Sequence, residues 1–470
     1  MANATCERRI EAPRPAAVEV TGPPWWVLPL VVAFGIFLRC WDLGRNGLTF
    51  DESFTAAAGR RSVGSLFDYL RHHDSHPPLD YLLRAPLARA GASEVALRLP
   101  SVAFSVGALV LFAWWMRRRG WVGVLATALF AVSAFEVRYG RMARMYALME
   151  LLGVLAVVVA AAWLEQPRRW HAWAVGGVVA VGLFDHVSAL LLGLGLLAVA
   201  GLRRDRDAWR WRVALALGVV PWAVLWGPSF LVQVHDDHAN WIPPTSLHSF
   251  TQNVGTPITD LGAAWALVAL VVAFGGFVLW KRAGDLGRVW ICCYAVPLAA
   301  LAAAGLAAQV FIPRTMMFAA WATPLAVAAV AGEVGRRWVP LGVAVGVLAV
   351  ALALPSTLAL LQQRNEPDVV MRHANAVVAD GDVIVVRPAW LVSLVEWRVG
   401  VHRGLPWHDV AIPGVRDVGA VRLGSGPASG RVWVLTPVGV AAPFAGAPAC
   451  AHPWSSGSTE IVCRSVTVSG

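Results

Sequence analysis

Two adjacent carboxylates, Asp51 and Glu52, follow the first long apolar segment of the chain and are the first candidates for chemistry. Ionisable side chains next to a membrane-spanning segment are usually functional. A carboxylate held there could accept the proton of a hydroxyl group as a general base. The structural alternative is that both acids favour the dipole at the start of a helix over residues 53–61. The two roles are compatible, and we predict that Asp51 and Glu52 are catalytic.

A cluster of histidines follows in the same polar segment and ends in His76-Pro77-Pro78. Each proline fixes its own φ and restrains the residue before it, so we expect the pair to hold His76 in a set direction. The residues that could also bind zinc are His72, His73, Asp74, His76 and Asp80. Their spacing matches no closed structural zinc site. We therefore assign no metal ligands and leave a divalent metal open, with a plain surface turn as the alternative.

Three arginines, Arg138, Arg141 and Arg144, stand in a later short connection between apolar segments. Arg141 and Arg144 are three residues apart and would share one face of a helical turn. Guanidinium groups suit a phosphate or pyrophosphate ligand, because their donors match its oxygens. The alternative is ion pairing with Asp51, Glu52 or Glu136. We predict that Arg141 and Arg144, together with His76, bind a phosphate group.

An aromatic residue, Trp241, precedes the pair Pro243-Pro244 in another connection. A tryptophan in such a rigid segment forms a wall of the kind on which sugars and isoprenoids pack. The equally acceptable alternative is that Trp241 anchors the chain at a membrane interface. We predict that it binds substrate.

These residues must be positioned by a helical membrane protein. Hydrophobic residues make up 57% of the chain and charged residues 14%, against about a quarter in soluble domains. The net charge of +10 does not predict nucleic-acid binding, because the basic residues form short clusters between apolar segments. Eleven segments approach the length needed to span a bilayer. They are Pro24–Trp41, Leu97–Met116, Gly120–Val137, Tyr146–Leu164, Trp170–Phe184, Val187–Leu202, Trp211–Val234, Leu261–Trp280, Val289–Val310, Met316–Val334 and Val339–Leu361.

The basic clusters predict the orientation of these spans. With eleven spans, all six clusters fall on one side, which the positive-inside rule makes cytoplasmic. The clusters are at residues 8–9, 117–119, 168–169, 203–206, 281–282 and 336–337. We expect a disordered cytoplasmic tail over residues 1–22, a transmembrane domain over 23–361 with its first outer loop at 42–96, and an extracytoplasmic domain over 362–470. The predicted location is the plasma membrane.

The C-terminal segment changes character and predicts a small α/β domain. We expect a helix over Asp368–Val378 and strands over Val383–Val386 and Arg431–Leu435. Cys450 and Cys463 also lie there, and an oxidising compartment would allow them to form a disulfide. The alternative is two free thiols.

In this order, the motifs resemble those of the GT-C superfamily of membrane glycosyltransferases, in the branch that holds protein O-mannosyltransferases and lipid A aminoarabinose transferase. The resemblance covers roughly residues 24 to 361. The motifs that carry it are Phe50-Asp51-Glu52, His76-Pro77-Pro78-Leu79, Ala96-Leu97-Arg98-Leu99-Pro100-Ser101, Ala143-Arg144-Met145-Tyr146-Ala147-Leu148 and Trp241-Ile242-Pro243-Pro244.

The resemblance implies an active site at the outer membrane interface. A sugar would pass, with inversion, from a polyprenyl-phosphate carrier to a glycan, lipid or protein acceptor. Asp51 matches the family's catalytic base and Glu52 its neighbour, His76 matches a position near the carrier phosphate, and Arg144 matches the arginine of the fourth-span motif. We predict that Tyr146, in the same motif, binds substrate. One departure is Ser75, because some relatives carry a carboxylate there.

Two other functions remain open at this point. A flippase or transporter for a polyprenyl-linked glycan would explain the spans and the arginines, and a non-catalytic scaffold would use only the C-terminal domain. We find no glycine-rich phosphate loop for a nucleotide sugar, which fits a lipid-linked donor. Lysine is almost absent, a bias that suggests a GC-rich bacterial genome and an undecaprenyl- or decaprenyl-type carrier. The sugar expected is mannose or another hexose or pentose.

Overall fold

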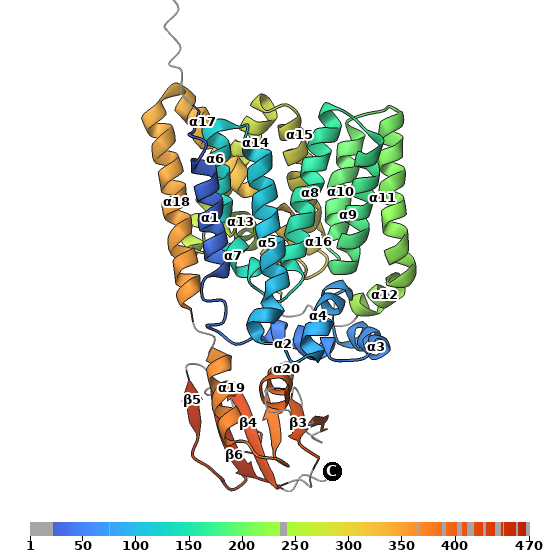
Figure 1. Ribbon diagram of the computed structural model, residues 1–470, viewed down its shortest axis with the longest axis vertical. Helices are drawn as coiled ribbons and strands as arrows, with labels where there is room; N and C mark the ends of the chain where they lie inside the picture. The colour runs from blue at the N-terminus through green and yellow to red at the C-terminus, as the bar shows by residue number, and fades with distance from the viewer. Residues whose placement is uncertain are drawn as a thin grey trace, which may run out of the picture.

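The computed structural model places a bundle of helices on a small C-terminal sheet (Figure 1). It describes residues 22–74, 76–235, 242–363, 366–387, 392–401, 407–410, 418–425, 429–437, 443–444, 446–456 and 459–466. The end of the bundle that faces the sheet is called the sheet end below. The expected fold class, a polytopic helical membrane protein with a small α/β region at its C-terminus, is confirmed.

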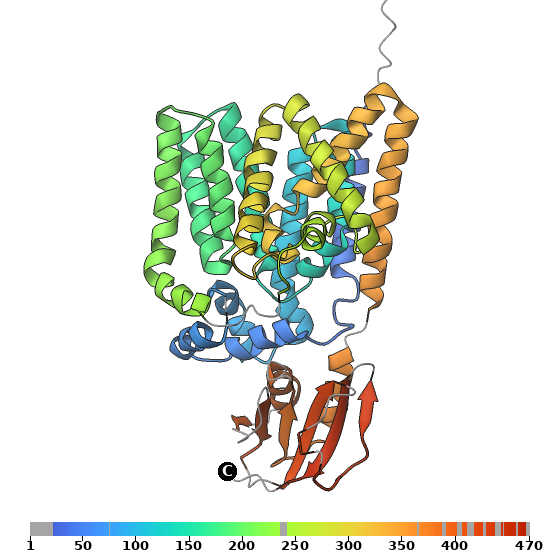
Figure 2. The ribbon, with the colours of Figure 1, turned by 180° about the vertical axis from the view of Figure 1, so that it is seen from behind.

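Long apolar helices form the bundle, which Figure 2 shows from behind. Its members are α1 (Val27–Cys40), α5 (Glu94–Met116), α6 (Gly120–Val132), α7 (Ala134–Gly140), α8 (Tyr146–Glu165), α9 (Arg169–Asp185), α10 (Ala189–Gly201), α11 (Arg206–Leu225), α14 (Trp265–Arg282), α15 (Asp285–Trp290), η2 (Ile291–Ala295), α16 (Val296–Gly305), η3 (Pro313–Ala319), α17 (Ala322–Arg337) and α18 (Val339–Gln362).

The number of spans is the point on which structure and sequence differ. Among the described residues, six helices are long and apolar enough to cross a membrane, or up to eight if each bent pair counts as one span. The bent pairs are α6 with α7, at 54°, and η3 with α17, at 67°. Each of the eleven predicted segments contains a helix. Several of these helices, such as α1 with 14 residues and α10 with 13, are shorter than the roughly 20 residues that a straight span requires.

Small residues allow neighbouring helices to approach closely. A Cβ atom on Gly176 of α9 would lie 2.5 Å from the carbonyl oxygen of Ala214 in α11, so this crossing accepts only glycine. Gly218 of α11 lies equally close to the backbone of α9. Close packing through glycine and alanine is typical of helices in membranes, where dispersion forces replace the hydrophobic effect as the main attraction.

Short helices cover the sheet end of the bundle (Figure 1). They are α2 (Phe50–Gly59), α3 (Val63–His73), α4 (Leu79–Arg89) and α12 (Gly227–His235). A further short helix, α13 (Leu247–Gly255), packs on α14. The N-terminus of α2 is fixed by a capping box, in which Thr49 accepts a hydrogen bond from the Glu52 backbone and Glu52 accepts one from the Thr49 backbone. This cap sets the position of Asp51 between them.

The C-terminal segment forms a six-stranded mixed sheet. Its order is β2-β3-β1-β4-β6-β5, with β1 parallel to β4 and the other neighbours antiparallel. The strands are β1 (Val383–Val386), β2 (Trp407–Asp409), β3 (Gly419–Leu423), β4 (Arg431–Pro437), β5 (Trp454–Ser456) and β6 (Thr459–Ser465), and α19 (Glu366–Val377) packs on the sheet. A disulfide joins Cys450 to Cys463 of β6.

The sheet region is attached to the bundle through α2. Phe50 of α2 packs against the apolar core that α19 shares with the sheet. Two further helices, α20 (Val392–Val395) and η5 (Glu396–Val401), lie between sheet and bundle. In η5, Trp397 is buried with Leu48 and Ala56, and the Arg398 guanidinium forms an ion pair of 2.6 Å with Glu94. The helix that carries Asp51 is therefore held from both sides.

Candidate active site

Glu52 anchors α2 to the bundle through a buried ion pair. Its two carboxylate oxygens accept hydrogen bonds of 2.7 and 2.8 Å from the Arg98 guanidinium of α5. The backbone N–H groups of Thr49 and Ala143 donate two more, each of 2.8 Å. Arg98 in turn donates to the carbonyl oxygens of the loop before α2, at residues 43, 46 and 47. One buried pair thus ties together α2, α5, the preceding loop and the connection that carries Arg144.

Arg144 lies in the connection between α7 and α8, and hydrogen bonds to its backbone carbonyl oxygen hold it in place. Its carbonyl oxygen accepts hydrogen bonds from Arg84, at 3.1 Å, and from Ser101, at 3.2 Å. Arg84 is itself held by a buried ion pair of 2.8 Å with Asp80. The orientation of Arg144 therefore depends on groups from α4 and α5 that do not reach the site themselves.

The side chain of Arg144 reaches α2 and α4. One guanidinium nitrogen donates to the hydroxyl oxygens of Thr55 and Tyr81, both at 2.9 Å, and approaches the carbonyl oxygen of Asp51 at 3.4 Å. A second nitrogen lies 3.5 Å from Nδ1 of His76. The structure therefore brings together Asp51, His76 and Arg144, three of the residues that the sequence singled out.

A carboxylate completes the histidine side of this group. Oδ1 of Asp74 lies 2.8 Å from Nδ1 of His76, and the Tyr81 hydroxyl donates to Oδ2 of Asp74. Burial would raise the pKa of the Asp74 carboxyl, but the charges and hydrogen bonds of His76, Arg144 and Tyr81 hold it well below its ordinary value. Asp74 is therefore ionised at neutral pH.

The carboxylate of Asp51 faces a second arginine. Its Oδ2 atom lies 3.4 Å from a guanidinium nitrogen of Arg314, at the start of η3. The Arg314 guanidinium also lies over the Tyr146 ring, 5.9 Å from its centroid. About a quarter of each of the two charged side chains, Asp51 and Arg314, remains exposed. The pair is therefore accessible, unlike the pair of Glu52 and Arg98.

His186, in the connection between α9 and α10, packs on the other side of His76. The two ring centroids are 5.1 Å apart, and the centroid of Tyr146 is 6.0 Å from that of His186. The backbone N–H of Ser188 donates to Nδ1 of His186 at 3.0 Å. In the neutral ring the proton is then on Nε2, which leaves a donor available for a ligand.

An apolar cavity lies between the short helices α3 and α4 and the bundle. It has a volume of about 280 Å³ and begins at Pro78, two residues after His76. Its walls come from α3, α4, α9 and α11, with Phe67, Leu79, Leu82, Phe184 and Leu225 among the lining residues.

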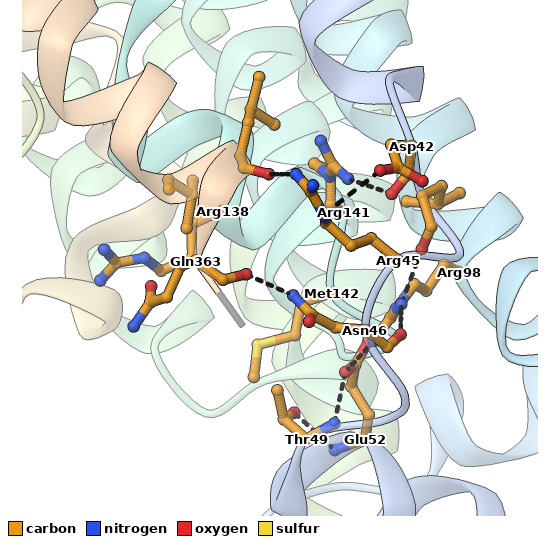
Figure 3. Close-up of a pocket in the computed structure, with 13 residues that line it drawn as sticks. Asp42, Arg45, Asn46, Thr49, Glu52, Arg98, Arg138, Arg141, Met142 and Gln363 are labelled. Carbon is orange, nitrogen blue, oxygen red and sulfur yellow. Dashed lines mark hydrogen bonds and ion pairs between the residues drawn. The ribbon is translucent and has the colours of Figure 1, made fainter. Parts of the chain in front are cut away.

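Arg141 occupies a different place from Arg144. Its guanidinium donates to the carbonyl oxygens of Leu38, at 3.1 Å, and Asp42, at 3.3 Å. It lines a larger cavity of about 660 Å³ that also contacts Thr49 and Glu52 (Figure 3). The three-residue spacing predicted that both arginines share one face, but α7 ends at Gly140 and the chain turns before α8. The two side chains therefore point to different sites.

Two further features of the sequence are Trp241 and the group of possible metal ligands. Trp241 lies outside the described residues. Within the part of the chain that the structure describes, no group of three or more His, Cys, Asp or Glu side chains is arranged to hold a metal ion. The group of possible ligands is divided, because His76 contacts Asp74 and Arg144 while Asp80 pairs with Arg84.

Several site residues were not among the predicted set. Arg314 and His186 are polar residues in connections between apolar segments, which is the same signal that found Arg144. Tyr81 and Thr55 lie four residues after Pro77 and Asp51, on helices whose facing sides the sequence alone did not reveal. Arg98 stood in a recognised motif, but no local pattern linked it to Glu52.

The fold was compared with known proteins. No protein-family profile matches the sequence, and no curated protein matches it. Among solved structures, ArnT from Cupriavidus metallidurans in its apo state has a TM-score of 0.58 at 16% identity, over 93% of this chain and 97% of that one. The same enzyme bound to undecaprenyl phosphate has a TM-score of 0.55 at 15% identity, over 93% and 98%. The chain therefore has the fold of this GT-C glycosyltransferase, as the sequence motifs predicted.

Proposed function

We propose that this protein transfers a sugar from a polyprenyl-phosphate carrier to an acceptor on the extracytoplasmic side of the plasma membrane, with inversion at the anomeric carbon. The observation that carries the proposal is that the accessible Asp51 carboxylate pairs with Arg314, while Arg144 reaches the backbone carbonyl oxygen of the same residue. A base beside cations is the arrangement that displacement of a phosphate leaving group requires.

In this proposal Arg144, Arg314 and His76 bind the carrier phosphate. Arg144 and Arg314 approach Asp51 from the α7–α8 connection and from η3, and His76 lies against Arg144. Two guanidinium groups can neutralise the charge that develops on the departing phosphate. The available proton of His186 would add a further donor at this point. The Tyr146 ring packs against the Arg314 guanidinium and would orient that side chain.

Asp51 acts as the general base. Its carboxylate would accept the proton of the acceptor hydroxyl while that oxygen attacks the anomeric carbon and the bond to the phosphate oxygen breaks. Before the donor binds, Arg314 holds the carboxylate at 3.4 Å. The carrier phosphate would compete for Arg314 and so release Asp51 for the acceptor. A single displacement of this kind gives inversion.

Glu52 has a positioning role. Its two oxygens accept four hydrogen bonds, and the residue is 1% exposed, so it has no free lone pair directed to substrate. The prediction that Glu52 is catalytic along with Asp51 is therefore not part of this proposal. Glu52 instead holds α2 against the connection of Arg144, and so sets the separation of base and cation.

The apolar cavity that begins at Pro78 would receive the first isoprene units of the carrier. Pro78, one of its lining residues, is two positions after His76 in the chain, and its other walls include α9 and α11 of the bundle, so a lipid chain could run from it into the bilayer. ArnT, which shares this fold, has been solved with undecaprenyl phosphate bound. The same class of carrier is proposed here, with mannose or another hexose or pentose as the sugar, and Trp241 as a further substrate contact.

The orientation of the chain follows from its arginines. The clusters at residues 117–119, 168–169, 203–206, 281–282 and 336–337 lie at or beside helix ends remote from the sheet end. The positive-inside rule then makes that end cytoplasmic and places Asp51 and the C-terminal sheet outside. Outside the cytoplasm, the disulfide between Cys450 and Cys463 would be in an oxidising compartment.

The experiment is a comparison of lipids and surface glycans, by mass spectrometry, from cells that have the protein, lack it, or carry Asp51→Asn. The proposal predicts that one glycosylated product disappears in both of the latter strains while the sugar-linked carrier accumulates. A flippase would instead work normally with Asp51→Asn. A product unchanged in the Asp51→Asn strain, at normal protein levels, would contradict the proposal.

A further inference from the structure

The larger cavity has a strongly basic lining that the proposed transfer does not use. It has a volume of about 660 Å³ and lies between the ends of α1, α7 and α18 and the start of α2. In the view of Figure 3, Arg138 and Gln363 lie on the left and Arg45 on the right, with Arg141 and Met142 between them. None of the proposed donor ligands, Arg144, Arg314 and His76, is among its lining residues.

The charges of this lining do not balance. Four arginines line the cavity, at positions 45, 98, 138 and 141, against two acids, Asp42 and Glu52. Glu52 is occupied by Arg98, and Asp42 lies 3.5 Å from Arg45. Arg138 pairs with Asp260, which does not line the cavity. The positive charge of Arg141 is left facing neutral partners, the carbonyl oxygens of Leu38 and Asp42.

An anion in the cavity would relieve a real electrostatic cost. Burial, followed by repulsion from Arg98, lowers the pKa of Arg141 to about 10. The guanidinium is nevertheless charged at neutral pH, and among the described residues no carboxylate forms an ion pair with it. Asp42, on the rim, has a φ of +47°, in the left-handed region that residues other than glycine seldom adopt. This turn directs the Asp42 carbonyl to Arg141.

Part of the remaining lining is apolar, beside the polar residues Asn46, Thr49 and Gln363. Leu360 and Leu361, in the last turn of α18, line the cavity together with Leu43 and Met142. Helices α1 and α18 expose large apolar side chains, among them Phe34, Phe37, Trp41, Val347, Leu348 and Leu358. Such faces contact acyl chains when helices lie in a bilayer. The end of α18 therefore contributes apolar side chains to a cavity that arginines also line, and the same helix exposes an apolar face.

From this combination we propose that the cavity is a binding site for the phosphate headgroup of an anionic membrane lipid, whose acyl chains leave between α1 and α18. Arg138, Arg141 and Arg45 would contact the phosphate, and Leu360, Leu361 and Met142 the first part of the chains. This inference goes beyond the proposed transfer and does not require it. The site adjoins Thr49 and Glu52 and so lies next to the capped end of α2 that carries Asp51.

The test measures lipid retained by the purified full-length protein. The protein is placed in nanodiscs of phosphatidylcholine with a minor fraction of phosphatidic acid, then released and analysed by native mass spectrometry. We expect bound phosphatidic acid on the wild-type protein, and a reduction of about tenfold or more in the double variant Arg138→Gln/Arg141→Gln, because charge-assisted contacts are lost. Equal retention by this variant would overturn the proposal.

A matched control separates the cavity from general attraction of anionic lipid to basic residues. Arg118→Gln/Arg119→Gln removes the same charge from exposed positions at the other end of α5. This variant should retain phosphatidic acid like the wild type, and a loss equal to that of the cavity variant would contradict a specific site. Leu361→Trp keeps every charge but fills the cavity, and it should also lose the lipid; full retention would contradict the assignment to this cavity.

Two further arms identify the source of the phosphate and separate this site from the transfer site. Millimolar inorganic phosphate should leave phosphatidic acid bound, whereas its displacement would assign the cavity to soluble phosphate and overturn the lipid assignment. Asp51→Asn should bind phosphatidic acid normally. If Asp51→Asn also transferred sugar normally, the proposed function would fail while the lipid site would stand.

Discussion

The Oδ2 atom of Asp51 lies 3.4 Å from a guanidinium nitrogen of Arg314, a residue 263 positions later in the chain. The same acid is approached from its backbone side by Arg144, whose position depends on Arg84 and Ser101. A partly exposed carboxylate thus pairs with one cation, and a second cation from another connection of the bundle contacts the backbone of the same residue.

Replacement of Arg314 should weaken the use of the donor. A hydrogen bond to a charged group contributes about 1.5–3 kcal/mol, so Arg314→Gln should lower kcat/KM for the sugar-linked carrier by roughly ten- to a hundredfold. Arg314→Lys keeps the charge but loses the planar fork, so its kcat/KM should lie between those of the wild type and Arg314→Gln. Arg288→Gln, which removes a surface arginine paired only with its own helix, is the control. Steady-state kinetics with a purified donor measure this effect. A wild-type kcat/KM for Arg314→Gln would remove Arg314 from the site.

Loss of one partner of the Glu52–Arg98 pair should destabilise the protein. Both side chains are buried, and removing either leaves an uncompensated charge, at a cost of about 3–5 kcal/mol. Glu52→Gln and Arg98→Gln should therefore both lower the melting temperature in detergent. Asp207→Asn breaks an ion pair of the same type that is about one-third exposed, and should have little effect. Similar melting temperatures for all three variants would contradict the anchoring role.

The contribution of Glu52 should depend on pH. Burial alone would raise the pKa of Glu52, but Arg98 and the backbone N–H groups of Thr49 and Ala143 lower it below its ordinary value of 4.5. A pKa lowered by folding adds stability that is fully present above the unfolded value and is lost as the pH falls through the folded value. The difference in melting temperature between wild type and Glu52→Gln should then be constant at neutral pH and narrow below about pH 4.5. A difference in melting temperature that widens in acid would contradict a lowered pKa of Glu52 in the folded protein.

The disulfide should stabilise the sheet region. Cys450 and Cys463 are separated by 13 residues, and a bridge that closes a loop of this size contributes about 2–4 kcal/mol. We expect Cys450→Ser/Cys463→Ser to raise the protease sensitivity of the segment after α19 while the bundle remains intact. Limited proteolysis read by mass spectrometry checks this. Cys292→Ser/Cys293→Ser, which alters two free cysteines of the bundle, should leave the cleavage pattern of the sheet unchanged.

The sequence was most informative where a polar residue stood between apolar segments. Asp51, His76 and Arg144 were selected because charges between apolar segments need a reason, and the structure brings them together. The strand over Val383–Val386 was found for the complementary reason, since a short β-branched run follows a clear turn. Both signals are local, and local signals can be read from one sequence.

Contacts between distant residues could not be predicted in this way. Nothing near Glu52 indicates that its partner is Arg98, and nothing near Asp51 indicates Arg314. Arg141 does not share a helix face with Arg144, as the three-residue spacing predicted, because α7 has already ended at Gly140. The span count also exceeded what length supports, since hydrophobicity does not reveal how long the helix inside an apolar segment is, and α1 and α10 have only 14 and 13 residues.

The most direct test of the central claim is turnover by purified Asp51→Asn, with a sugar-linked polyprenyl phosphate as donor and the acceptor identified from cells. Asparagine keeps the size of the side chain but cannot act as a base, so we predict a loss in kcat of about a hundredfold or more, with donor binding and melting temperature retained. Near-normal kcat in this variant would show that Asp51 is not the base and would contradict the account.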